Sequence, residues 1–233
     1  MPEVVPTTAD NDGKSKSVKD TMMKHFLQTV GKITFFDRGH DDRQFVNCHA
    51  FINVKPTMTL TANNAGASGS FLPAVNITQA GSGQGELPRF TWNNPRNGTG
   101  SYALVVEDID ARGSGITGAY MHHGLFYNIP PGRLSANNYD VEKQTGENRN
   151  RLTATALNYV DTRDKGLAYL APSPSYGHGT HRYVFTIVAL TESFISFKRP
   201  DKVTRKEFQK YIKGKVVSYG QWTGMSKRSR SHK

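Results

Sequence analysis

Hydrophobic and polar positions alternate in short runs along most of the chain, a pattern typical of β-strands. The runs are rich in β-branched and aromatic residues, and loops containing Gly, Pro and Asn separate them. This turn-rich spacing predicts a mainly β fold, a mostly antiparallel sandwich, in preference to repeated βαβ units. We expect strands or extended segments at residues 57–62, 71–78, 87–92, 102–107, 125–129, 153–159 and 182–190.

An amphipathic helix is predicted near the start of the chain. It begins at Ser17, which has the position of an N-cap with Asp20 as the third-position acid, and Gly31 ends it. The residues before it contain almost nothing to bury, so we expect them to be disordered. The predicted organisation is a leader at 1–16, a helix with its extension at 17–53, a single domain at 54–225 and a basic tail at 226–233.

A second amphipathic helix is predicted near the end of the chain. Thr204 begins a capping-box pattern, and Gly214 is placed to end the helix. We expect its apolar face to pack on the domain, a short strand at 215–219 to follow, and the polar tail at 226–233 to stay free. The apolar face consists of Phe208, Tyr211 and Ile212, and the opposite face of Arg205, Lys206, Lys210 and Lys213.

The formal net charge of +11 is concentrated at one end of the chain. Residues 1–53 hold seven basic and seven acidic side chains, residues 54–197 eleven and ten, and residues 198–233 twelve and two. A folded middle that is nearly neutral argues against a domain whose whole face grips nucleic acid, so we do not expect specific nucleic-acid binding. The region 198–233 is either a solvated face or a surface that attracts an acidic partner such as an anionic membrane or RNA.

Composition excludes several classes of protein. With 36% hydrophobic and 10% aromatic residues, the chain suits one globular domain, and its apolar runs are far shorter than the ~20 residues that span a bilayer. The first residues lack the pattern of a secretory signal, so we expect a cytoplasmic protein. Cys48 is the single cysteine, which excludes an internal disulfide and a zinc site with two thiolates.

Three polar clusters lie where strong predicted strands begin or end. Alternation puts His181 and Tyr183 on one face of a strand and His122 and His123 on opposite faces, so only one of the adjacent histidines can reach a given pocket. A carboxylate, two imidazoles and a phenol at neighbouring strand ends make a small polar cup that can bind an anion such as phosphate, and the carboxylate favours a zwitterionic headgroup. The clusters are Asp108-Ile-Asp110, His122-His123-Gly, and Gly177-His-Gly-Thr-His181-Arg-Tyr183.

Together with the runs 87–92 and 102–107, these clusters resemble the phosphatidylethanolamine-binding protein family over roughly residues 54–224. That family includes the Raf kinase inhibitor proteins, the plant flowering regulators and the fungal carboxypeptidase Y inhibitor. The resemblance implies an antiparallel Greek-key β-sandwich with a smaller second sheet, a C-terminal helix, and a pocket for phosphate, phosphoethanolamine or phosphotyrosine-like groups. Matched residue by residue, it implies ligand-binding roles for Asp108, Asp110, His123, His181 and Tyr183, with Pro172 and Ser173 on the rim.

The sequence leaves several functions open. The first is a non-enzymatic protein that binds a phosphorylated small molecule or phospholipid headgroup and inhibits or scaffolds a kinase or protease, with no cofactor. A hydrolase could combine Ser173 or Ser175 with His178 or His181 and Asp108 or Asp110, but no Gly-x-Ser-x-Gly elbow exposes a serine. A metal site of two histidines and a carboxylate is a third reading. A scaffold with a vestigial pocket is a fourth, because Ile109 and Arg112 replace both prolines of the family's Asp-Pro-Asp-Ala-Pro motif.

Overall fold

The computed structural model confirms a mainly β fold. The predicted leader at 1–16 and the helix predicted from Ser17 to Gly31 lie outside the described residues, apart from Met22. In the part that is described, no helix is both long and apolar enough to cross a membrane. The structure describes residues 22, 39–78, 85–95, 98–111, 121–141, 144–145, 152–153, 157–160, 162, 167–193 and 203–228.

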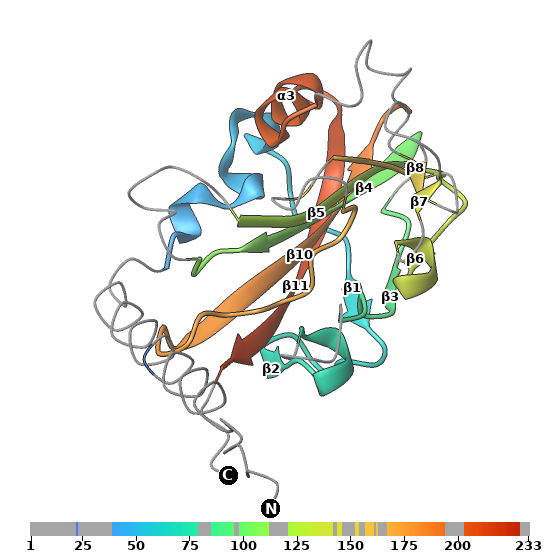
Figure 1. Cartoon of the computed structure of the whole chain (residues 1–233). Helices are drawn as coiled ribbons and strands as arrows, with labels where there is room; N and C mark the ends of the chain where they lie inside the picture. The colour runs from blue at the N-terminus through green and yellow to red at the C-terminus, as the bar shows by residue number, and fades with distance from the viewer. Residues whose placement is uncertain are drawn as a thin grey trace, which may run out of the picture.

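The main sheet has eight strands in the order β2-β11-β10-β4-β5-β9-β8-β7. Its paired strands are antiparallel except for β2 and β11, which run parallel. Long strands form the centre and short ones the edges (Figure 1). The bounds are β2 (Ser70–Phe71), β4 (Ser101–Asp108), β5 (Met121–Ile129), β7 (Gln144–Thr145), β8 (Leu152–Thr153), β9 (Asn158–Val160), β10 (Thr180–Leu190) and β11 (Val216–Lys227).

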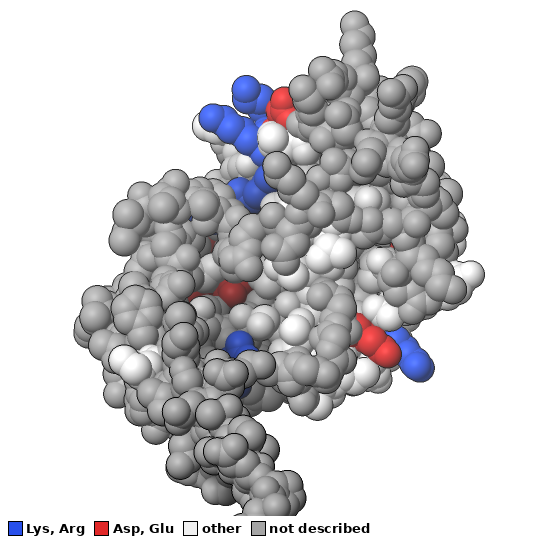
Figure 2. All heavy atoms as spheres, in the orientation of Figure 1, with Lys and Arg blue, Asp and Glu red and all other residues white. Residues whose placement is uncertain are grey.

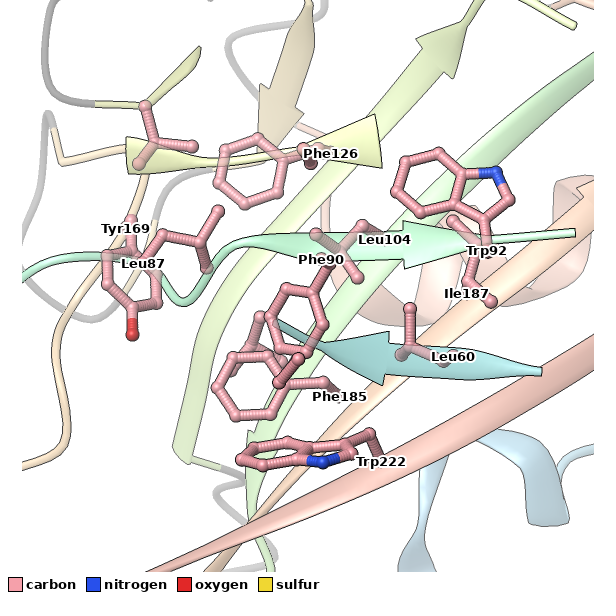
Figure 3. Close-up of a cluster of buried hydrophobic side chains, with 14 of the residues drawn as sticks. Leu60, Leu87, Phe90, Trp92, Leu104, Phe126, Tyr169, Phe185, Ile187 and Trp222 are labelled. Carbon is pink, nitrogen blue, oxygen red and sulfur yellow. The ribbon is translucent and has the colours of Figure 1, made fainter. Parts of the chain in front are cut away.

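A smaller second sheet packs against one face of the main sheet. It consists of β1 (Leu60–Ala62), β3 (Phe90–Trp92) and β6 (Ser135–Ala136), in the order β1-β3-β6. Figure 3 shows its aromatic and aliphatic side chains inserted among those of the main sheet. The ring centroids of Phe90 lie 4.8 Å from Phe185 and 5.7 Å from Trp222. These contacts join the two sheets through a core of the kind that the sandwich prediction requires.

The opposite face of the main sheet is covered by helical segments. Three 3-10 turns, η1 (Asp41–Arg43), η2 (Phe45–Asn47) and η3 (His49–Phe51), lie beside helix α3 (Arg205–Tyr211) on this face (Figure 1). Phe45, Phe51 and Phe208 are buried in a second apolar cluster together with alternate residues of the central strands. The central strands are therefore buried on both faces, which explains why β4 reads as an uninterrupted apolar run.

The expected extended segment at 71–78 is wrong for most of its length. Pairing stops after Phe71, and the 3-10 turn η4 (Ala74–Asn76) follows. Pro73 explains the change, because proline has no backbone N–H to donate to a sheet and its fixed φ suits the start of a turn. A further 3-10 turn, η5 (Asn138–Asp140), begins with a capping box at Asn137.

Helix α3 forms as predicted, but the strand after it is much longer than expected. Thr204 and Glu207 make the reciprocal capping box, and Gly214 has a φ of +78°. β11 extends from Val216 to Lys227, so it runs eight residues beyond the predicted end at 219 and two into the predicted tail. Pairing with β10 satisfies its backbone, and Gly220 allows close approach, since a Cβ there would lie 2.3 Å from the Met58 carbonyl oxygen.

Candidate functional site

The three polar clusters meet at one end of the central strands. Asp108 ends β4 opposite Tyr183 of β10, and His123 lies on the neighbouring strand β5. All are buried, with exposed fractions of 6% for Asp108, 2% for His123 and 0% for Tyr183. The predicted cup is thus assembled by strand pairing and lies on the face that carries the small sheet.

A chain of hydrogen bonds links Asp108, His181 and His178. Oδ2 of Asp108 lies 2.8 Å from Nδ1 of His181, and Nε2 of His181 lies 2.7 Å from Nδ1 of His178. A carboxylate can only accept, so His181 donates from Nδ1 and, when neutral, accepts at Nε2 from His178. Both nitrogens of His181 therefore serve within the protein. The ring is therefore fixed in orientation, and it links the Asp108 carboxylate to His178 through hydrogen bonds.

Sequence reasoning missed the place of His178, which it considered only as the base of a hydrolase. The residue is fully buried. Gly177 and Gly179 flank it with φ values of +74° and +90°, a conformation that favours glycine. This tight turn brings His178 back onto His181, with ring centroids 4.8 Å apart. The Gly-His-Gly triplet at residues 177–179 was the signal in the sequence that could have predicted this turn.

His123 and Tyr183 complete the cup. Nδ1 of His123 lies 2.6 Å from the carbonyl oxygen of Leu170, so this nitrogen carries the proton. Its ring meets Tyr183 edge to face with centroids 5.1 Å apart. Burial, aided by the Asp108 carboxylate, raises the pKa of Tyr183 well above its ordinary value. The phenol consequently stays protonated and remains a hydrogen-bond donor.

The segment 170–173 forms the side of the cup next to His123. The backbone N–H of Leu170 donates to the His123 carbonyl at 2.8 Å, which fixes this segment along β5. Pro172 is buried, and its carbonyl accepts from the backbone N–H of Thr78. The next residue, Ser173, is exposed. Of the two rim residues that the resemblance implies, only Ser173 is therefore open to solvent.

The resemblance groups Asp110 with the ligand-binding residues, and its backbone N–H does donate to Oδ1 of Asp108 at 3.0 Å, but its carboxylate is bound by residues outside the cup. Its Oδ2 accepts from Nε and from the backbone N–H of Arg182, both at 2.9 Å, and its Oδ1 accepts from Gly39. Arg182 also pairs with Asp41. Its hydrogen bonds to the two carboxylates, that to Asp110 first, raise the pKa of Arg182. Asp110 therefore fastens the chain at 39–41 to β10.

His122 points to the other face, as strand alternation predicts. It lines a hollow beside α3 with Arg205 and Cys48. Burial, then the charges of His123 and Arg205, lowers the pKa of His122 to about 4. The imidazole is accordingly neutral at physiological pH.

The cup presents side chains and backbone groups that form hydrogen bonds. Within the ranges that the structure describes, no three His, Cys, Asp or Glu side chains converge as ligands. The Asp108 carboxylate is already matched by His181 at 2.8 Å. What remains toward a small ligand is a phenol, imidazole groups and backbone, a set that suits an anion such as phosphate.

Comparison with known proteins places these residues in context. Residues 62–227 match the family profile of the phosphatidylethanolamine-binding protein. The chain is 33% identical over 197 residues to the Phomoidride biosynthesis cluster protein B of Talaromyces stipitatus, covering 84% of this chain and 78% of that one. It is 32% identical over 206 residues to the protein of the same name from a Fungal sp., covering 86% and 93%.

The fold is also similar to a crystal structure from E. coli. That protein, YbcL, is a member of the mammalian PEBP family. The TM-score is 0.57 at 19% identity, and the match covers 74% of this chain and 99% of YbcL. The likeness shows a shared sandwich fold.

Proposed function

The chain belongs to the phosphatidylethanolamine-binding protein family, and from this premise we propose that it binds a phosphate-bearing headgroup in the cup without transforming it. Binding would regulate a protein partner such as a kinase or a protease, through inhibition or scaffolding. The observation that supports the proposal most is the buried chain from Asp108 through His181 to His178, beside His123 and Tyr183.

The chain of hydrogen bonds suits an anion for an electrostatic reason. Asp108 holds the ring of His181 and places a negative charge beside the pair of imidazoles. A buried proton next to a bound phosphate gains a charge-assisted hydrogen bond, which is roughly twice as strong as a neutral one. The carboxylate also gives the ammonium group of a zwitterionic headgroup a nearby negative charge.

The proposal is tested by calorimetric titration with O-phosphorylethanolamine. Replacing His123 or His178 with Ala should each remove an imidazole that donates to the phosphate from a protonated Nε2, and should cost about 1.5–3 kcal/mol of binding. The matched control is His49→Ala, an exposed histidine on the other face of the sheet. Equal affinity in the wild type and both cup variants would refute the assignment of the pocket, and no binding to any of them would support a scaffold with a vestigial pocket.

A second candidate is an enzyme that uses the same chain for acid–base chemistry. A carboxylate that orients an imidazole is the arrangement that activates a general base. The two fungal relatives are named for a biosynthesis cluster, which is compatible with either a binding or a catalytic role. The serine triad is less well supported, because Nε2 of His181 meets His178 where a triad would place its nucleophile.

Turnover separates the two candidates. We expect p-nitrophenyl phosphate and p-nitrophenyl acetate to be hydrolysed no faster with the protein than with buffer, and a fluorophosphonate probe to leave Ser173 and Ser175 unlabelled. Hydrolysis that disappears in both Asp108→Asn and His178→Ala would favour the enzyme instead.

A further inference from the structure

A groove runs between the 3-10 turns and α3, on the face of the main sheet opposite the cup. Two hollows of about 470 Å³ and 350 Å³ share Cys48, Lys206 and Gln209, so they form one continuous depression along the helix. We call it the α3 groove. Its described lining residues include Arg43, Gln44, Asn47, His122, Arg205, Lys210 and Lys213.

The α3 groove is strongly cationic. Among the described residues that line it, Asp42 is the only acidic one, and it lies 3.7 Å from Arg43. Arg205 is matched by the buried Glu107. The remaining charges belong to lysines, and Figure 2 shows Lys and Arg side chains gathered over the position of α3. The lysines are Lys206, Lys210 and Lys213.

The acidic side chains near these lysines are engaged with other groups, so the lysines remain available to a ligand. Glu207 is the acidic residue of α3 itself, but its carboxylate accepts from the N–H and hydroxyl of Thr204 in the capping box. Glu192 pairs with Lys215 at 2.8 Å. Lys206, Lys210 and Lys213 are exposed and have no ion pair among the described residues. Glu207 attracts Lys210 electrostatically, but a ligand could neutralise all three lysines without breaking an ion pair of the described residues.

The inner wall of the groove adds a polar group of its own. Nδ1 of His122 is buried, and within the described part of the chain nothing hydrogen-bonds to it. The imidazole is neutral, so it can donate to or accept from a ligand. Ala50, which lines the smaller hollow, and the lysine stems add apolar surface to the groove. The groove thus combines charge, hydrogen bonding and apolar contact.

From this geometry we infer that the α3 groove is a docking site for an extended acidic peptide segment of a protein partner. Lys206 and Lys210 are one helical turn apart, about 6 Å along the axis. Side chains on one face of an extended strand repeat at a similar spacing, about 6.6 Å. A peptide with acidic residues at alternate positions would match both lysines and leave its backbone in contact with the apolar stems.

The shape of the site favours a peptide over a membrane surface. A bilayer presents a flat plane of charge, whereas His122 and Cys48 line a depression. A flat surface would meet only the exposed lysine ends and would leave the hollows empty. A single extended chain can enter the depression and reach the imidazole. The lysines alone would serve either partner, so binding to vesicles is the competing outcome.

The test uses the full chain and a fluorescein-labelled peptide, Gly-Glu-Ala-Glu-Ala-Glu-Gly, in fluorescence polarisation at physiological salt. We expect saturable binding that is lost when each Glu of the peptide is replaced with Gln. Reversing Lys206 and Lys210 to Glu should weaken binding at least about tenfold, since two favourable pairs become repulsive. Lys206→Gln with Lys210→Gln should give an intermediate loss.

A second charge reversal serves as the matched control. Lys55→Glu with Lys227→Glu changes net charge by the same amount at exposed residues outside the groove and should leave peptide affinity within about twofold. Equal losses of peptide affinity in the two double variants would mean that overall charge attracts the peptide, and would overturn the assignment of the site. The site would also fall if phosphatidylserine vesicles, and not the peptide, bound through Lys206 and Lys210.

The groove is independent of the cup in this experiment. His123→Ala should bind the peptide like the wild type, whatever its affinity for O-phosphorylethanolamine. On ligand addition, the ring signals of His122 should shift in NMR spectra. An unchanged His122 together with normal peptide affinity would mean that the peptide does not enter the depression, and would overturn that assignment.

Discussion

The two faces of the main sheet build contrasting environments from adjacent residues of the same strands. Asp108 and His123 turn toward the small sheet, while Glu107 and His122, one position earlier on each strand, face α3. The first pair is buried, and on its face imidazole rings hydrogen-bond to the carboxylate and to each other. The second borders an open groove in which cations predominate. A two-residue period therefore lets two neighbouring dipeptides serve two separate sites.

The contrast extends to how each face treats a buried carboxylate. Asp108 is matched by the imidazole of His181, which donates to its Oδ2 from Nδ1 at 2.8 Å. Glu107 is matched by the permanently charged guanidinium of Arg205, and its other oxygen accepts from the N–H of Phe45 at 2.8 Å. Asp108 therefore fixes the orientation of the His181 ring, whereas the Glu107 pair holds η2 and α3 on the sheet.

Removing Arg205 should produce the largest effect. Arg205→Ala leaves Glu107 buried without its cation, and breaking a buried pair in this way costs about 3–5 kcal/mol of unfolding free energy. Urea denaturation measures the loss. The matching change on the cup face, His181→Ala, should cost less, because it removes hydrogen bonds to Asp108 and His178 and not a permanent positive charge.

The pH dependence of Arg205→Ala provides the check. Burial raises the pKa of Glu107, and Arg205 opposes that rise. In the variant the pKa of Glu107 rises further. The loss of unfolding free energy should therefore be greatest at neutral pH and shrink as Glu107 becomes protonated in acid. A deficit that is independent of pH would indicate lost packing of the arginine against Phe45 instead, whose ring centroid lies 5.4 Å from the guanidinium.

The next largest effect concerns acid stability and His122. Its pKa is about 4 in the folded protein against 6.5 ordinarily, so the unfolded chain binds the additional proton first. Stability is therefore lost as pH falls from 6.5 toward 4, by roughly 2–3 kcal/mol. His122→Gln should flatten this part of the stability profile measured by denaturation. An identical profile for the variant would mean that His122 is not the group responsible.

A smaller effect is expected on the cup face when its ligand is present. An anion stabilises a protonated imidazole, so affinity for O-phosphorylethanolamine should fall by about tenfold as pH rises from about 5.5 to 8. Calorimetry across this range measures the trend, and His123→Gln should reduce it. Constant affinity would mean that Tyr183 and the backbone hold the ligand without charged histidine.

Much of the sandwich could be predicted from the sequence, because its central strands are apolar and β-branched. β4 and β10 lie close to their predicted bounds for this reason. β11 could not be delimited in the same way. Seven of its 12 residues are polar or glycine, and Ser218 and Ser226 are buried only because their partners, far away in sequence, are in place. Residues of this kind give no local signal for a strand.

The candidate site likewise has features that follow from the local sequence pattern and others that depend on long-range contacts. Strand alternation was enough to separate His122 from His123 and to pair His181 with Tyr183. It could not reveal that Arg182 would capture Asp110, because that pairing joins residues 72 positions apart and depends on the turn after β4. The α3 groove depends on contacts of still longer range, such as that from Arg205 to the Arg43 carbonyl across 162 positions.

The smallest expected effect is the coupling between the two faces. Reversing Lys206 and Lys210 to Glu should change affinity for O-phosphorylethanolamine by less than about twofold at physiological salt. Both lysines are exposed, the main sheet lies between them and the cup, and charge in solvent is screened over about 8 Å. At low salt the screening length grows to about 30 Å at 0.01 M, so a modest loss of affinity should then appear. A loss of more than about fivefold that persists at high salt would show that the faces communicate through the shared strands, with Glu107 and Asp108 as adjacent residues that connect them.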